Sequence, residues 1–165
     1  MKFIIKNKVF EIKTLKLKNI NLNYVRKTSN EYINFKKKTI KDQKKYVKEL
    51  RKSHNEIYQI MYKNLLIATS GFQFNNSKTY QGLLIIDNNF LGKGMAKYFI
   101  YSSIVVVNKS LKKKIFYANI EKKNKASLKS FIGAGYKIIN KSDNSLNLKL
   151  DIKQKNLFLK KNFNY

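Results

Sequence analysis

The sequence has no cysteine, proline or tryptophan, and it has only one histidine, His54. Without cysteine there can be no disulfide framework, no thiolate metal site and no cysteine nucleophile. A single histidine argues against a serine-type catalytic triad and against a histidine-based zinc site. We therefore expect a function that needs neither a thiol nor a metal.

Acidic residues are also scarce, since 36 Lys and Arg stand against 9 Asp and Glu and the formal net charge is +27. Only two of the cations are arginines, Arg26 and Arg51, and the lysines are spread along the whole chain. This pattern, with abundant Asn, Ile, Tyr and Phe, is typical of an AT-rich genome and favours a solvated basic surface over a dedicated nucleic-acid groove. Such a surface still attracts anionic ligands and repels polycations.

Long apolar runs are missing. The N-terminal stretch from Met1 to Lys6 is too short for a signal peptide, and the segment from Met95 to Val107 is shorter than the roughly 20 residues that span a bilayer. We expect a cytoplasmic protein without a membrane span. The length of 165 residues suits one domain, residues 1–165, with a core from about 9 to 152 and a C-terminal tail over 154–165.

The apolar patterns predict an α/β domain with a mixed sheet. Strands are expected at 10–13, 57–62, 65–74, 80–86, 114–120, 136–139 and 146–152. Helices are expected within 19–38 and at 39–52, 95–108 and 124–134. The run Val105-Val106-Val107 locally favours a strand, but the glycine-bearing loop before it favours a helix. Lys63-Asn64 is a short hairpin turn.

The first segment that suggests chemistry runs Ile85-Ile86-Asp87-Asn88-Asn89-Phe90-Leu91-Gly92-Lys93-Gly94-Met95-Ala96. A buried strand leads through a Gly-Lys-Gly loop into a helix. The first N–H groups of a helix have no partner within it and lie at the positive end of its dipole, so this arrangement favours an anion. The segment lacks the Gly-Lys-Ser/Thr of a nucleotide triphosphatase loop and the third glycine of a dinucleotide fold.

The second segment is Asn124-Lys125-Ala126-Ser127, followed by Gly135-Tyr136. A helix capped by Asn124 and ended by Gly135 would explain these residues on structural grounds alone. The order and spacing of the two segments, however, resemble the GNAT superfamily of N-acetyltransferases. Gly94 and Ala96 match the last two defining positions of its (Arg/Gln)-x-x-Gly-x-(Gly/Ala) motif. Asn124, Ser127 and Gly135-Tyr136 resemble its next motif, Asn-x-x-(Ala/Ser) ending in Gly-Phe/Tyr.

The resemblance implies a mostly antiparallel sheet of six or seven strands, separated at its centre and flanked by about four helices. Acetyl-CoA, as co-substrate, would lie between the strand ending at Ile86 and the strand 114–120. Its pyrophosphate would contact Leu91, Gly92, Lys93, Gly94, Met95 and Ala96. Its pantetheine arm would contact Leu84, Ile85, Ile86, Asn124 and Ser127. A backbone N–H near Ile85 or Ile86 would stabilise the oxyanion that forms when an amine attacks the thioester directly.

Two positions depart from the family pattern. Leu91 stands where Arg or Gln is usual, so one phosphate contact is lost, which Lys93 or the positive field could replace. Phe131 stands where many members have a tyrosine that protonates the departing thiolate. Tyr117, Ser130 or a water are weaker candidates for that acid, and the thiol itself is a tolerable leaving group.

For the general base, Asp87 and Glu121 are the acids near the expected site, although Asp87 also suits a turn. Tyr80 and Gln81 are candidates to contact the substrate or to relay a proton through water.

Charge bears on the acceptor. A chain with a net charge of +27 is a poor host for a polyamine and a better one for an anionic acceptor. The N-terminal half resembles bacterial amino-sugar-nucleotide N-acetyltransferases through Tyr24-Val25-Arg26, where Arg26 would contact phosphate. The leading acceptor is therefore a nucleotide-linked amino sugar, and a protein N-terminus, such as that of a ribosomal protein, is the second. The sequence is also compatible with a basic nucleic-acid-binding module and with a CoA-binding protein that has lost catalysis. We expect no specific nucleic-acid partner, and a monomer or homodimer.

Overall fold

The computed structural model describes residues 1–15, 55–75, 77–85 and 87–152, together with the helical positions Lys41, Lys45 and Lys48. The described residues form one eight-stranded sheet in the order β1-β2-β3-β4-β5-β6-β8-β7. The strands are β1 (Lys2–Ile5), β2 (Lys8–Thr14), β3 (Asn55–Tyr62), β4 (Leu65–Asn75), β5 (Lys78–Ile85), β6 (Ile115–Glu121), β7 (Lys137–Lys141) and β8 (Ser145–Asp151). The helical elements are η2 (Asn88–Phe90), α3 (Ala96–Leu111) and α4 (Lys125–Gly133).

The mixed α/β architecture predicted from the sequence is confirmed, but the sheet has one strand more than expected. The additional strand is β1, which pairs antiparallel with β2 through a turn at Lys6-Asn7. Both turn residues have positive φ, 48° and 59°, as hairpins of two-residue loops require. Lys63-Asn64 repeats the same conformation between β3 and β4. The N-terminal hairpin was not predicted because its first strand has only four residues and a Lys-Asn turn is a weaker indication than Asn-Gly.

The predicted helices are confirmed where they fall on described residues. Lys41, Lys45 and Lys48 are helical and exposed, as expected for one face of the helix at 39–52. The helices expected within 19–38 lie outside the described residues. None of the described helices is long and apolar enough to cross a membrane.

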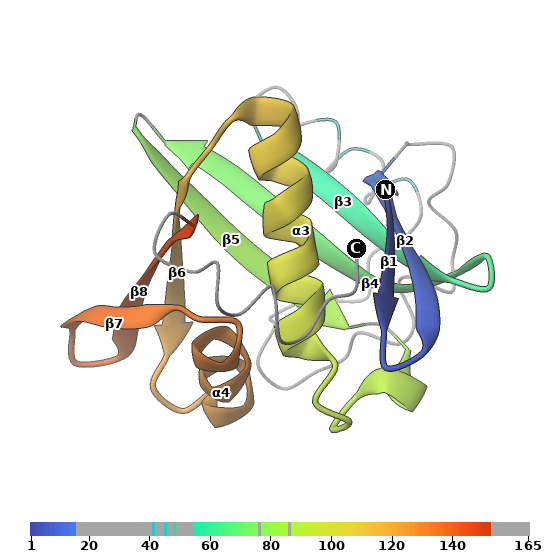
Figure 1. The fold of residues 1–165 in the computed structure, drawn as a ribbon. Coiled ribbons are helices and arrows are strands. Elements are labelled where there is room, and N and C mark those ends of the chain that lie inside the picture. The colour runs from blue at the N-terminus through green and yellow to red at the C-terminus, as the bar shows by residue number, and fades with distance from the viewer. Residues whose placement is uncertain are drawn as a thin grey trace.

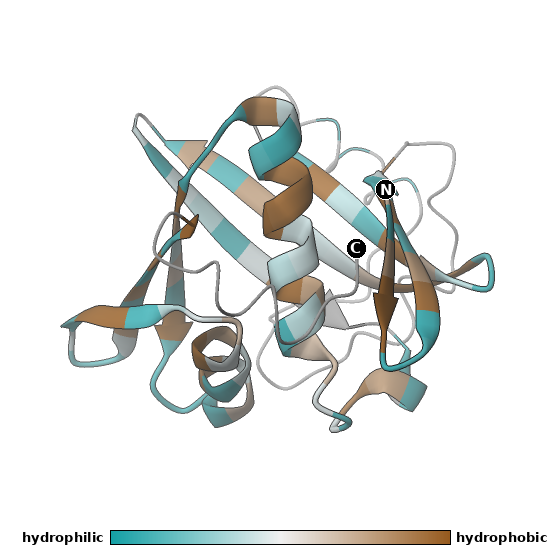
Figure 2. Ribbon diagram, viewed as in Figure 1, coloured by the Kyte–Doolittle hydropathy of each residue, from teal (hydrophilic) through white to brown (hydrophobic). Residues whose placement is uncertain are grey.

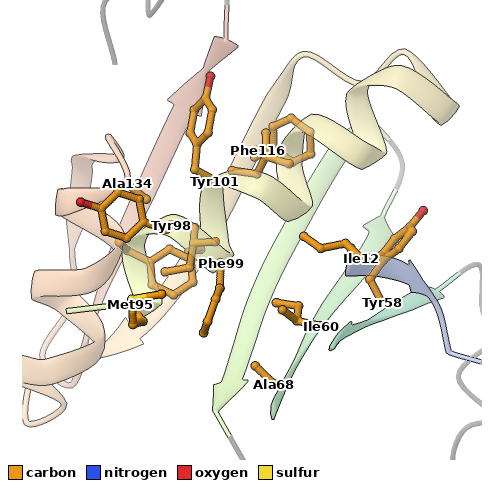
Figure 3. Packing of buried hydrophobic residues seen from close by; sticks show 14 of the residues in the cluster. Ile12, Tyr58, Ile60, Ala68, Met95, Tyr98, Phe99, Tyr101, Phe116 and Ala134 are labelled. Atoms are coloured by element: carbon orange, nitrogen blue, oxygen red, sulfur yellow. The ribbon is translucent and has the colours of Figure 1, made fainter. Parts of the chain in front are cut away.

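Helix α3 packs across one face of the sheet (Figure 1), and Figure 2 shows that apolar residues recur along it. Ile100, Ile104 and Val107 are fully buried at spacings of four and three residues, which is the period of a helix face, and Phe99 beside them is buried as well. This packing explains why the valine-rich stretch is helical despite its local preference for a strand. Figure 3 shows Phe99 and Met95 beside Ile60 and Ala68 of the sheet.

The centre of the sheet is where its continuity is weakest. β4 and β5 pair antiparallel over eight residue pairs, from Ala68–Ile85 to Asn75–Lys78. β5 and β6 run parallel, and within their described residues only Tyr80 and Tyr117 are paired. The two strands separate toward their C-terminal ends (Figure 1). The separated centre predicted from the sequence is therefore confirmed.

Candidate functional site

The loop from β5 to α3 is anchored to the core at two points. Phe90 is buried and packs edge-on against Phe10 and Tyr62, with ring centroids 5.9 and 5.6 Å apart. Met95, immediately before α3, is also buried. Between these anchors Leu91 is 39% exposed, and Gly92, Lys93 and Gly94 are exposed as well. The ends of the loop are therefore held by packing while its middle presents backbone to the surroundings.

Gly92 and Gly94 have left-handed backbone conformations, with φ of 69° and 67°. A side chain would be strained at either position. Among the described residues, nothing lies within 4 Å of where a Cβ would stand on either glycine. α3 begins next to them with no side-chain cap and no acidic residue in its first turn. Within the described residues the first N–H group of α3 with a hydrogen-bond partner is that of Tyr98, which donates to the Met95 carbonyl at 3.0 Å, and no acidic side chain there neutralises the positive end of the dipole.

Two basic side chains lie at this loop. Lys93 lies within it, and Lys6, from the β1–β2 turn, places its Nζ 3.4 Å from the Lys93 carbonyl oxygen. The Asp87 carboxylate accepts a 2.9 Å hydrogen bond from the Asn89 N–H, which is the turn-forming arrangement expected for an aspartate at this position. The Gly-Lys-Gly loop is therefore a positively charged loop with exposed backbone, which we call the cradle, and its chemistry is that of an anion site. The contribution of Lys6 could not be inferred from the sequence, because it depends on the unpredicted hairpin.

The second predicted segment forms α4. Asn124 caps this helix, and its Oδ1 accepts a 3.0 Å hydrogen bond from the Ser127 N–H. At the other end the Tyr136 N–H donates to Phe131 O and the Gly135 N–H donates to Ile132 O, with Gly135 at φ 102°. This is a Schellman ending, so both predicted ends of the helix are confirmed. Asn124 and Ser127 are half-buried at the end of the helix next to β6.

The separated strands leave backbone groups of β5 facing the gap. The Ser70 hydroxyl donates a 3.2 Å hydrogen bond to the Gly82 carbonyl, so that carbonyl faces β4. Carbonyl directions alternate along a strand, and those of Leu83 and Ile85 therefore face β6. No β6 residue in the described pairing is opposite them. Ile86 lies outside the described residues.

No protein-family model matches the chain, and no curated protein matches it. Several solved structures do match the chain. The Campylobacter jejuni N-acetyltransferase PseH in complex with acetyl coenzyme A superposes with a TM-score of 0.63 at 18% identity, over 86% of this chain and 99% of that one. A spermidine N-acetyltransferase SpeG chimera from Vibrio cholerae and hSSAT has a TM-score of 0.70 at 12% identity, over 88% and 96%. The aminoglycoside acetyltransferase AAC(6')-Ib in complex with coenzyme A has 0.73 at 9% identity, over 87% and 95%.

The chain has the GNAT fold. At these identities the likeness establishes the fold alone, and the named acetyltransferases differ in the acceptors that their names give.

Within this GNAT fold, the three predicted catalytic candidates lie on different elements. Tyr117 lies on β6, half-buried, with its ring centroid 5.6 Å from that of Tyr80. Ser130 lies on α4, and its hydroxyl donates a 2.8 Å hydrogen bond to the Ala126 carbonyl. Asp87 lies at the end of β5, where it forms the turn described above. The structure brings Tyr80 and Tyr117 together and does not bring Ser130 into hydrogen bonding with either of them.

Gln81 is only 6% exposed, and each polar atom of its side chain has a partner in the protein. Its Nε2 donates to Ser70 Oγ at 3.0 Å and to the Ile100 carbonyl of α3 at 2.9 Å. Its Oε1 accepts a 2.7 Å hydrogen bond from the Tyr136 hydroxyl. A role for Gln81 in contacting substrate would have to break these bonds. Arg26, the remaining predicted substrate contact, lies outside the described residues.

Tyr136 and Phe131 are buried and pack against each other. Their rings pack edge-on with centroids 5.1 Å apart, and both are nearly inaccessible. Burial raises the pKa of the Tyr136 hydroxyl well above its usual value, so it remains a hydrogen-bond donor. Sequence reasoning identified Tyr136 as part of a motif but gave no sign of its bond to Gln81. Among the described residues, no group of three His, Asp or Glu side chains is placed to hold a metal ion.

Proposed function

We propose that the protein is an N-acetyltransferase that moves an acetyl group from acetyl-CoA to a primary amine. The observation that carries this proposal is the open, uncapped backbone cradle at Gly92–Ala96, positioned beside two parallel strands that pair only at Tyr80 and Tyr117. A phosphate-bearing ligand that enters the cradle can extend along the unpaired edge of β5. Few ligands other than a nucleotide-tethered acyl carrier need both features at once.

The cradle residues Leu91–Ala96 would hold the pyrophosphate through backbone N–H groups, with Lys93 and Lys6 adding charge. Asn124 uses its Oδ1 for the cap, and its Nδ2, which has no hydrogen-bond acceptor among the described residues, would donate to the ligand. Ser127 would line the same arm. The backbone around Leu83–Ile85 offers the strand-like partners that β6 does not supply.

When bound, acetyl-CoA supplies an acetyl group that is activated as a thioester. The contribution of the chain is to orient this group and to stabilise negative charge on the carbonyl oxygen. A backbone N–H of β5 that faces the gap, near Ile85, would do so, and such a donor is worth about 10²–10³ in rate. No protein nucleophile is required. Asp87 and Tyr117 would serve proton transfer through water, because no described residue hydrogen-bonds to either of them as an activating acid or base.

The acceptor that we propose is a nucleotide-linked amino sugar. The net charge of +27 opposes the approach of a polycationic amine and favours an anionic acceptor. A protein N-terminus would be accepted in its place only if the site tolerated a peptide chain without a phosphate group.

Calorimetry with CoA tests the first step. Gly94→Asn is the sharpest variant, because asparagine tolerates a left-handed backbone while its side chain fills the space above the loop. We expect the wild type to bind CoA and Gly94→Asn to bind it at least tenfold more weakly, with an unchanged circular dichroism spectrum. Absence of CoA binding by the wild type would overturn the proposed function.

A free-thiol assay with acetyl-CoA and a panel of amines tests the second step. We expect thiol release with UDP-linked amino sugars and not with polyamines. Release with peptides alone would move the acceptor to a protein N-terminus, and tight CoA binding without release from any amine would identify a non-catalytic CoA-binding protein. Binding of RNA or DNA that falls steeply with salt, in place of CoA binding, would identify a nucleic-acid module.

A further inference from the structure

The face of the sheet opposite α3, which we call the outer face, carries a second set of features beside the gap. Gln81 and Ser70 reach toward α3, so their strand neighbours point the other way. On β5 the residues that alternate onto the outer face are Lys78, Tyr80 and Gly82. All three lie next to the point where β5 and β6 separate.

Gly71 of β4 and Gly82 of β5 are direct partners on this face. The β4–β5 register is regular across them, and neither glycine has a positive φ. A bulge or an unusual backbone conformation therefore does not explain why two glycines stand opposite each other. Glycine in a strand interior also marks places where another group approaches the backbone closely. Among the described residues nothing lies within 4 Å of where a Cβ would stand on either glycine, and Gly82 is exposed.

An aromatic and basic cluster lies beside the Gly71–Gly82 pair, which we call the floor. Tyr80 and Tyr117 place their ring centroids 5.6 Å apart, and Lys78 holds its Nζ 5.5 Å from the Tyr117 ring centroid. Lys149 of β8 is the direct cross-strand partner of Tyr117, so its side chain emerges beside that ring on the same face. The Lys78 ammonium group thus lies over this ring, and Lys149 stands on the neighbouring strand of the same face, an arrangement that suits a phosphate next to a flat ring.

Amide groups stand on the other side of the gap. Asn119 follows Tyr117 on the outer face of β6, and its Nδ2 donates a 2.9 Å hydrogen bond to Oδ1 of Asn147 on β8. Asn119 is exposed, so this amide pair can also bond hydroxyl groups of a ligand. The next acid along the same face of β6, Glu121, is already in a 3.1 Å ion pair with Lys123. Asp151 of β8 also lies on this face, two positions from Lys149, and it has a partner of its own. The described residues of the site therefore offer mainly amide, aromatic and cationic groups.

We propose that the outer face binds the acceptor, with its sugar ring on the Gly71–Gly82 floor and its diphosphate at Lys78 and Lys149. The ligand class is a nucleoside diphosphate-linked amino sugar. The order of the site fits the sugar and its diphosphate: the ring lies at the Gly71–Gly82 pair and Tyr80 next to the gap, and the diphosphate lies beyond it at Lys78 of β5 and Lys149 of β8. The C–H groups of a sugar ring suit the negative face of Tyr80, and the amides of Asn119 and Asn147 suit its hydroxyls. This inference rests on the proposed function, because the amine must reach an acyl group in the gap.

A binding experiment tests the site without requiring catalysis. Calorimetry measures UDP, GDP and ADP against the wild type, against Lys78→Gln/Lys149→Gln, and against Lys109→Gln/Lys112→Gln. The last variant removes the same charge at the C-terminal end of α3, on the other face of the sheet. We expect at least one nucleoside diphosphate to bind the wild type and the α3 variant equally and the outer-face variant about tenfold more weakly or worse. Absence of binding by the wild type, or equal weakening in both variants, would overturn the proposal.

Gly82→Val tests the floor. Valine suits a strand and its Cβ meets no described atom, so we expect the variant to fold. Calorimetry with CoA should give a dissociation constant within twofold of the wild type, while kcat/KM for the UDP-linked amino sugar falls more than tenfold. An unchanged kcat/KM with normal CoA binding would overturn the acceptor site and leave the proposed function standing. Absence of CoA binding by the wild type would instead contradict the proposed function itself.

Discussion

The Tyr136 hydroxyl donates a 2.7 Å hydrogen bond to the side-chain carbonyl of Gln81, between residues that are 55 positions apart in the sequence. Tyr136 lies between α4 and β7, on the C-terminal side of the separated strands, and Gln81 lies on β5. The amide nitrogen of Gln81 in turn holds Ser70 and the Ile100 carbonyl of α3. One buried side chain therefore connects both sides of the gap with the helix that carries the cradle.

Replacing Tyr136 with phenylalanine should destabilise the fold. The change leaves the Gln81 Oε1 without its buried donor, and an unsatisfied buried polar group costs about 1–3 kcal/mol. Urea denaturation followed by circular dichroism would measure the loss. Tyr62→Phe is the matched control, because the contacts of Tyr62 with Phe10 and Phe90 are made by its ring. Equal stability of the Tyr136 and Tyr62 variants would contradict the importance of this bond.

The two residues should also be energetically coupled. In Gln81→Leu the Tyr136 hydroxyl loses its acceptor, so each single substitution carries a penalty that the double substitution avoids in part. We expect a coupling free energy of about 1 kcal/mol or more in a double-mutant cycle measured by denaturation. Additive effects of the two substitutions would show that the bond does not act as a unit.

Asn124 allows its structural and ligand-binding roles to be separated. Asn124→Asp keeps a side-chain oxygen for the Ser127 N–H, so helix stability should change little. It also removes the Nδ2 donor and adds a negative charge, and we expect CoA to bind at least tenfold more weakly. Asn124→Ala should lose both the binding and about 1 kcal/mol of stability. Normal CoA affinity in Asn124→Asp, measured by calorimetry, would restrict Asn124 to its capping role.

Stability should fall at alkaline pH because of the buried tyrosines. Burial, the largest cause, raises the pKa of Tyr58 to about 12. Since the folded state holds this proton more tightly than the unfolded state, the stabilisation is complete below about pH 10 and is lost as the pH rises toward 12. The stability difference between wild type and Tyr58→Phe should therefore shrink by about 1 kcal/mol between pH 8 and pH 11. A constant difference across this range of pH would show that Tyr58 ionises normally in the folded protein.

Much of the fold could be predicted from local patterns. The alternation of Leu146, Leu148 and Leu150 placed β8 correctly, and the cap at Asn124 placed α4. The N-terminal strand β1 was not predicted because it has only four residues, Lys2–Ile5, and its turn, Lys6-Asn7, lacks the glycine that marks such hairpins. Only the pairing with β2 holds these turn residues in a left-handed conformation. The same Lys-Asn turn at 63–64 was predicted because longer β-rich runs stand on both sides of it.

The candidate site, too, could be predicted only in part. Its backbone cradle follows from two glycines before a helix, which are visible in the sequence. Its long-range elements are not: the position of Lys6 beside Lys93, the bond between Tyr136 and Gln81, and the facing pair Gly71–Gly82 all depend on which strands become neighbours. Gln81 illustrates the limit, because a polar residue near the site was expected to face substrate and is instead buried among protein partners.

The lone pairing of Tyr80 with Tyr117 also has a kinetic consequence. The amide protons of Leu83 and Ile85, directed away from β4, should exchange with deuterated solvent far faster than those of their strand neighbours that β4 protects. A molecule lying along that edge would slow them selectively. Hydrogen exchange would therefore detect a bound molecule as slower exchange at every second amide of β5, without a measurement of turnover.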